Sequence, residues 1–199
     1  MKHFLGVKKI GHGGTLDPLA TGLLIIGINQ KTKTLNQFLL ENKKYQAIIE
    51  LNKKTTTADA EGKLITTQDV VINLAQLTNV INYFNGLEYY QTPHQFSAVK
   101  VNGKKLYQYA RTEKSVIITP RKVKIFQLKL IAFNFPYIEI ELEVSKGFYV
   151  RSFAEDLATK LNTVAYLKKL VRTKCHNFVL TDETLDVMKL KKSLKKENT

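Results

Sequence analysis

The chain has 199 residues, of which 44% are hydrophobic and 10% aromatic, enough for one domain with a sizeable core. Its 31 lysines and arginines outnumber 17 acidic residues and leave a net charge of +14, which favours a polyanionic partner such as nucleic acid, although lysine-rich surfaces also serve solubility alone. The single cysteine, Cys175, cannot form an internal disulfide, no Cys and His cluster has metal-site spacing, and no apolar run reaches the roughly 18 residues of a membrane span. We therefore expect a cytoplasmic protein without a metal.

The hydrophobic pattern of the first half predicts short elements separated by polar loops. In chain order they are a strand over residues 23–28, a helix over 33–40, a strand over 45–51, a polar loop over 55–62, and a helix whose core stripe is Val70, Leu74, Leu77, Ile81 and Phe84. In the second strand Ala47, Ile49 and Leu51 share one face, which we expect to be buried. Gly86 is placed to end the second helix.

The second half is richer in β-branched residues. It predicts strands over residues 116–118, 123–131 and 138–144, followed by a helix over 153–161. The order of strands and helices is mixed, so we predict an α+β fold with a mixed, largely antiparallel sheet flanked by helices. No repeat or Pro/Gly-rich linker divides the chain, which predicts one domain over residues 1–188 and a basic tail over 189–199.

The most informative stretch is the glycine-rich run GHGGTLDPLATG at residues 11–22. Its glycines permit tight turns, and its one acid, Asp17, precedes Pro18, which pushes it out of the helical region and presents it in an extended backbone. Asp-Pro by itself is also a common turn opener. The whole run, however, resembles the catalytic motif of the bacterial-type tRNA pseudouridine synthase B family. The resemblance implies that Asp17 is the catalytic carboxylate and that His12 takes the place of a flipped base.

Two further segments are similar to the same family. Tyr45 follows a lysine at the start of a predicted strand, where the family has a tyrosine that stacks on the target uracil; a strand tyrosine is otherwise usually a core residue. The stretch over residues 91–111 resembles a family segment that binds RNA, and there Lys100, Tyr107 and Arg111 are candidates to bind phosphates and stack on bases. The same residues would also suit a solvated helix over a tyrosine-lined core.

Two last segments complete the implied pocket. SKGFYVRSF at residues 145–153 resembles the family segment whose arginine pairs with the catalytic aspartate, so Arg151 is expected within about 4 Å of Asp17, favouring and orienting an ionised carboxylate. LKKLVRTK at residues 167–174 resembles the segment that sets Leu170 against the wall of the uracil pocket. The leucine spacing there is also that of an amphipathic helix.

The resemblance implies a pseudouridine synthase fold over residues 1–188 and an RNA-modifying isomerase active in tRNA processing. The expected reaction converts the T-loop uridine at position 55 by base flipping, glycosidic cleavage, rotation and carbon–carbon rejoining. The T-arm of tRNA is the expected partner, and a monomer with no cofactor, no metal and no membrane contact is expected. The chain departs from the family in starting after its usual opening strand, in stopping before a small C-terminal RNA-binding domain, and in carrying Thr56 where an acid is usual.

Those departures leave a second interpretation open, a non-catalytic RNA-binding or tRNA-folding module derived from such an enzyme. A third, a generic basic ribosome-associated protein, explains the charge but not the glycine-rich run. Asp17, Tyr45 and Arg151 are all present, and a decayed enzyme has no reason to keep the three together. The sequence therefore favours the enzyme.

Overall fold

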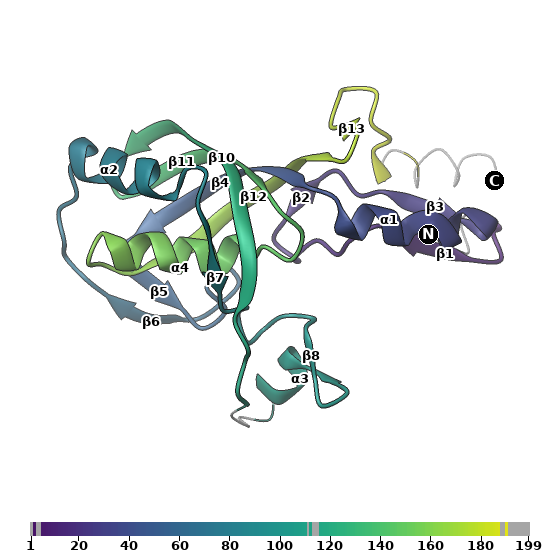
Figure 1. The fold of residues 1–199 in the computed structure, drawn as a ribbon, viewed down its shortest axis with the longest axis horizontal. Coiled ribbons are helices and arrows are strands. Elements are labelled where there is room, and N and C mark those ends of the chain that lie inside the picture. Colours follow the sequence, from purple (N-terminus) through teal and green to yellow (C-terminus); the bar gives the residue numbers. More distant parts are fainter. Residues whose placement is uncertain (1, 3–4, 111, 113–115, 188–189, 191–199) are drawn as a thin grey trace.

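The computed structural model describes residues 2, 5–110, 112, 116–187 and 190 (Figure 1). In chain order the elements are β1 (Ile10–His12), β2 (Thr21–Gly22), β3 (Ile26–Ile28), the 3₁₀ helix η1 (Asn29–Thr34), α1 (Leu35–Leu40), β4 (Lys43–Leu51), β5 (Lys53–Thr55), β6 (Leu64–Thr67), α2 (Leu74–Phe84), β7 (Glu88–Gln91), β8 (Lys100–Val101), β9 (Lys104–Lys105), α3 (Leu106–Ala110), β10 (Arg121–Asn134), β11 (Tyr137–Val144), α4 (Val150–Lys160), β12 (Ala165–Cys175) and β13 (Phe178–Val179).

A seven-stranded sheet forms the centre of the molecule. Its strands follow the order β13-β12-β4-β11-β10-β7, and every neighbouring pair in that series is antiparallel. The short strand β2 joins the sheet as a parallel partner of β12. The predicted α+β class with a mixed, largely antiparallel sheet is therefore confirmed.

One face of the sheet forms the main core. Ala47, Ile49 and Leu51 of β4 are buried there, as their alternation predicted, beside the apolar residues of β11. Helices α2 and α4 cover this face side by side (Figure 1), and Phe84 of α2 meets Phe153 of α4 edge-on with ring centroids 5.2 Å apart. Burial of these side chains is the main force that holds both helices on the sheet.

Local sequence sets the limits of α2. Asn73 caps the helix by accepting from the Gln76 amide, while the Gln76 side chain accepts from the Asn73 amide, a reciprocal capping box. The helix ends at Phe84, and Gly86 follows with φ of 79°, a conformation that glycine adopts without strain. The prediction that Gly86 ends this helix is confirmed.

Two predicted strands differ from the structure. Residues 23–28 are not one strand: β2 ends at Gly22 and only Ile26–Ile28 forms β3, because Leu23 turns inward to bond Arg172 while Leu24 is exposed. Residues 116–118 form no strand, although they are rich in β-branched side chains. β-branched residues form a strand only where a neighbouring strand is available, and no strand of the described chain pairs with residues 116–118.

The segment over residues 167–174 is a strand, β12, and not an amphipathic helix. Leu167 and Leu170 both face the core although they lie three positions apart, which a regular strand would not allow. A register shift between Leu167 and Lys169, where β12 pairs with β4, inserts the extra residue that returns Leu170 to the core face. The bulge therefore gives a strand the leucine spacing of a helix.

The opposite face of the sheet holds a buried carboxylate. Glu50 of β4 accepts from the Lys53 amine at 2.7 Å, the Lys168 amine at 2.8 Å and the Tyr166 hydroxyl at 2.5 Å. Burial raises the pKa of Glu50, but these three hydrogen bonds prevail and lower it to about 2. The charge at this position is therefore paired by side chains of β5 and β12.

Two parts project from this central body (Figure 1). The β1–β3 hairpin packs with η1 and α1 into a small lobe whose own core includes Leu23, Leu35 and Phe38. The second projection carries β8, β9 and α3 between β7 and β10. Within the described residues no helix is both long enough and apolar enough to cross a membrane. Of the predicted basic tail over 189–199, only Leu190 lies within the described residues.

Candidate active site

A cleft of about 820 Å³ opens where the central sheet meets both projections. Its lining comes from the glycine-rich loop, the start of β4, the loop after β5, the segment that enters the second projection, the start of α4, and β12. Loops held by a rigid sheet at a concave surface are the usual setting for a binding or catalytic site. The chemistry of this cleft depends on the charged side chains at its floor.

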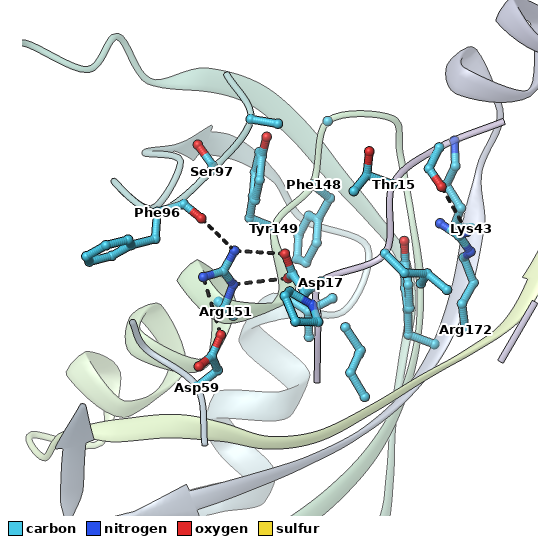
Figure 2. Close-up of a pocket in the computed structure, with 18 of the residues that line it drawn as sticks. Thr15, Asp17, Lys43, Asp59, Phe96, Ser97, Phe148, Tyr149, Arg151 and Arg172 are labelled. Atoms are coloured by element: carbon cyan, nitrogen blue, oxygen red, sulfur yellow. Dashed lines mark hydrogen bonds and ion pairs between the residues drawn. The ribbon is translucent and has the colours of Figure 1, made fainter. Parts of the chain in front are cut away.

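Asp17 and Arg151 form the central pair of the cleft. The Arg151 Nη2 donates to Asp17 Oδ1 at 2.8 Å and its Nε donates to Oδ2 at 3.0 Å (Figure 2). This bidentate geometry fixes the plane of the carboxylate as well as its distance. The residues lie 134 positions apart in the sequence, and the predicted contact within about 4 Å is confirmed.

Arg151 is itself held on every side. Its side chain is 4% exposed, and its remaining hydrogens go to the Thr57 carbonyl at 3.1 Å and the Phe96 carbonyl at 3.0 Å. Asp59 pairs with its Nη1 at 3.4 Å, so one guanidinium lies between two carboxylates (Figure 2). A buried cation with this many acceptors has little freedom to turn, which keeps Asp17 in one orientation.

Asp59 was not among the predicted site residues. Its side chain is only 3% exposed, and it accepts from the Thr57 hydroxyl at 2.5 Å and the Glu61 amide at 3.0 Å. The sequence placed it in a polar loop, where an acid is ordinary, and gave no sign that the loop folds over Arg151. The one available signal was that the same loop carries Thr56, a position where the resembling family usually has an acid.

Tyr45, Leu170 and His12 line the same cleft. Tyr45 lies opposite Arg172 on the neighbouring strand; burial raises the pKa of its phenol, and the positive charge of Arg172 opposes that shift. Leu170 is buried and presents an apolar wall, whereas His12, at the end of β1, is exposed at the rim. The structure therefore brings these three together with Asp17 and Arg151, and a sixth predicted residue, Tyr107, lines the same cleft.

The residues predicted in the second projection differ in whether they line the cleft. Tyr107 of α3 lines the cleft beside Lys105, whereas Lys100 of β8 is exposed and does not line it. Arg111 lies outside the described residues. Phosphate binding by Lys100 thus stays a prediction about the surface of the projection and not about the cleft.

A partly buried chain of hydrogen bonds fixes the start of α4, the helix that carries Arg151. The Tyr149 amide donates to Gln91 Oε1 at 2.8 Å, Gln91 donates to the Tyr89 hydroxyl at 2.9 Å, and that hydroxyl donates to Asp156 at 2.9 Å. Burial raises the pKa of both Tyr89 and Asp156. The first turn of α4 is therefore tied to β7, which precedes the second projection.

His94, beside this site, makes stability sensitive to acid. Burial, and next the charge of Arg151, lower its pKa to about 4 from an ordinary 6.5. As pH falls between these two values the unfolded chain gains a proton that the folded chain does not, so the free energy of unfolding decreases. Between about pH 7 and pH 5 the free energy of unfolding should therefore fall by about 1–2 kcal/mol less in His94→Gln than in the parent protein.

Urea unfolding of both proteins at the two pH values measures this difference. His176→Gln, which alters an exposed histidine beside Glu41, is the matched control and should follow the parent. Equal acid sensitivity of the parent and His94→Gln would contradict the burial of a neutral imidazole.

Among the described residues no group of three or more His, Cys, Asp or Glu side chains is arranged to hold a metal ion.

Comparison with known proteins agrees with this geometry. Residues 2–150 match the family described as TruB family pseudouridylate synthase (N terminal domain). Proteins named tRNA pseudouridine synthase B are 45% identical in Ureaplasma parvum serovar 3 over 184 residues, with 92% of this chain and 81% of that protein covered, and 45% identical in Malacoplasma penetrans over 196 residues, with 98% and 84% covered.

Among solved structures, a chain of "Crystal Structure of a Cbf5-Nop10-Gar1 Complex" superposes with a TM-score of 0.70 at 25% identity. The superposition covers 93% of this chain and 45% of that one, so the chain spans less than half of that solved chain. The match over three quarters of the sequence, the high identity to curated relatives and the shared fold lead to one conclusion. The chain belongs to the TruB family of pseudouridylate synthases.

Proposed function

We propose that this chain converts the uridine at position 55 in the T-loop of tRNA to pseudouridine, with Asp17 as the catalytic carboxylate. The observation that carries the proposal is the bidentate pair of Asp17 and Arg151 at the floor of the cleft. The cleft volume of about 820 Å³ suits a bound nucleotide, since small-molecule sites usually measure roughly 300–1,000 Å³.

The reaction needs a reactive group and a closed space and no oxidant. The bond from the ribose C1′ to uracil N1 breaks, the detached base turns, and C1′ joins C5, which loses its proton while N1 gains one. Covalent attack at C1′ and removal of a ribose proton both use a carboxylate in its ionised form. Arg151 supplies the matching charge and holds both carboxylate oxygens of Asp17.

A base inside an RNA loop must leave its stack to reach Asp17. Tyr45 and Leu170 offer an aromatic face and an apolar wall for the detached uracil, and a protonated phenol at Tyr45 can donate a hydrogen bond. We expect His12, which is exposed at the rim of the cleft, to occupy the space that the base leaves. Lys105 and Tyr107 on the opposite rim can contact the phosphates and bases of the loop.

tRNA as the substrate is supported by the names of the curated relatives and by the net charge of +14, which favours release of counterions from a nucleic acid. We further propose that the chain acts as a monomer. We also propose that residues 189–199, which are rich in lysine, are a basic tail outside the catalytic domain. The proposed compartment is the cytoplasm, where tRNA is processed.

The test uses a T-arm hairpin that carries tritium at C5 of its uridines. We expect tritium release that follows enzyme concentration, and we expect it to disappear when the uridine equivalent to position 55 is replaced by cytidine. Tight binding of the hairpin without any release would instead support the non-catalytic RNA-binding module. Release that survives the cytidine replacement would contradict the assigned position.

A further inference from the structure

Arg172 is a buried cation that the proposed chemistry does not use. It lies in β12, is 2% exposed, and ranks among the largest fully buried side chains of the protein. Its Nε donates to the Leu23 carbonyl at 2.7 Å and its Nη2 donates to the Gly14 carbonyl at 3.1 Å. A charge buried so completely is costly unless it is fully hydrogen-bonded, so its partners indicate what it stabilises.

Those partners are the two ends of the loop that carries Asp17. Gly14 precedes the catalytic aspartate and Leu23 follows it, so one guanidinium holds both ends of a ten-residue segment, residues 14–23. The backbone of Arg172 adds to this hold, because its carbonyl accepts from the Leu23 amide at 2.8 Å. The same residue therefore closes the loop through its side chain and its main chain.

Gly22 shows how close this contact is. It pairs with Arg172 in the parallel bridge between β2 and β12 and has φ of 94°. A Cβ atom at this position would lie 2.4 Å from the Arg172 carbonyl oxygen, a distance that no side chain tolerates. Only glycine lets the loop settle directly on β12.

The loop has few other anchors to the sheet. β2 contributes a bridge of two residues, and the Ala20 amide bonds only within the loop, to the Asp17 carbonyl. Leu19 and Ala20 pack against the edge of the main core, and the ionic tie of the loop is the contact that catalysis requires, between Asp17 and Arg151. Two cations therefore hold the segment from opposite sides, Arg151 at its reactive middle and Arg172 at its ends (Figure 2).

We propose that Arg172 is a positioning residue for the uridine isomerisation, which keeps the loop of residues 14–23 seated on β12 so that Asp17 stays in bidentate contact with Arg151. This inference rests on the proposed function of Asp17. Arginine suits the position because its planar, rigid fork reaches two divergent carbonyls, whereas the single ammonium of a lysine cannot hold both in the same geometry. Tyr45, which also lies beside Arg172, is the second cleft residue that its loss would disturb.

The first test compares Arg172→Met and Arg172→Lys with the parent on the T-arm hairpin. We expect kcat to fall roughly tenfold or more in Arg172→Met, with KM within about threefold, because a displaced carboxylate slows the reaction without removing RNA contacts. Arg172→Lys, which retains the charge, should lie between the two. Glu50→Gln is the matched control: it disturbs a buried, fully paired charge on the other face of the same sheet and should retain kcat.

Chemical rescue with a small guanidinium compound distinguishes a positioning role of Arg172 from general damage to the fold. In Arg172→Ala the space left beside the cleft should admit ethylguanidinium, which we expect to restore part of kcat, while the parent and Glu50→Gln show no gain. Absence of rescue together with an equal loss of kcat in Glu50→Gln would overturn the inference. If Arg172→Met does not fold, Arg172→Lys and the rescued alanine variant carry the same comparison.

Hydrogen exchange on the free protein tests the loop without any reaction. The amides of Ala20 and Leu23 should exchange at least about tenfold faster in Arg172→Lys than in the parent, whereas amides of the central strand β4 keep their protection. Unchanged exchange in the loop would overturn the inference even if activity fell. If the parent itself never converts the hairpin, the proposed function fails, and the exchange result still decides whether Arg172 holds the loop.

Discussion

Asp17→Asn should lower the rate of pseudouridine formation on the T-arm hairpin on the order of 10³-fold or more, since it removes the ionised group while leaving the shape of the side chain. An asparagine can still accept from one nitrogen of Arg151, so the loop should remain in place and the affinity for the hairpin should change little. Single-turnover rates and a binding isotherm on the same hairpin measure the two quantities.

Asp182→Asn is a suitable control for this variant. It makes the same chemical change at an exposed position near the end of the described chain and should alter neither the rate nor the affinity. Turnover by Asp17→Asn at the parental rate would contradict the role given to this carboxylate. Loss of binding in parallel with the rate would instead assign Asp17 to the folding of the RNA-binding surface.

Arg151→Met should have the largest effect on stability. It leaves Asp59 buried without its cation and removes the donors to two backbone carbonyls, and breaking a buried pair of this kind costs about 3–5 kcal/mol. The rate of isomerisation should fall as well, because Asp17 loses both of its hydrogen bonds. Urea unfolding and single-turnover kinetics report the two losses separately.

A second substitution distinguishes the two losses. Adding Asp59→Asn to Arg151→Met removes the unpaired buried carboxylate, so part of the stability should return while the rate stays low. Lys122→Met, which breaks an exposed ion pair with Glu88, is the control and should cost no more than about 1 kcal/mol. Full recovery of the rate in the double variant would show that Arg151 matters only for folding.

Much of the fold could be predicted from periodicity. The alternation from Tyr45 to Leu51 identified the central strand β4, and the stripe ending at Phe84 identified α2, because both elements bury one regular face against a single core. The apolar residues 23–28 misled the same reasoning. They are divided between a loop held by Arg172 and the short strand β3, and no period records such a division.

Some residues of the candidate site could likewise be predicted from the sequence, and others could not. Asp17, Tyr45 and Arg151 were predicted because long motifs resemble a known family, and the structure places all three in one cleft. Asp59 and Arg172 were not predicted, because the role of each depends on burial. A sequence shows a charged residue in a loop or strand, and its usual place is the surface. Only the folded chain shows that both are almost fully covered.

The central claim is that Asp17 acts on a uridine that has entered the cleft. A structure of the protein bound to a T-arm hairpin with 5-fluorouridine at the target tests it most directly, since fluorine at C5 replaces the proton that must leave. The account predicts a flipped nucleotide with its ribose C1′ or uracil ring about 3–3.5 Å from an Asp17 oxygen, Tyr45 against the ring face and Leu170 at its edge. A hairpin bound with that nucleotide still stacked in the loop, or seated away from Asp17 and Arg151, would contradict it.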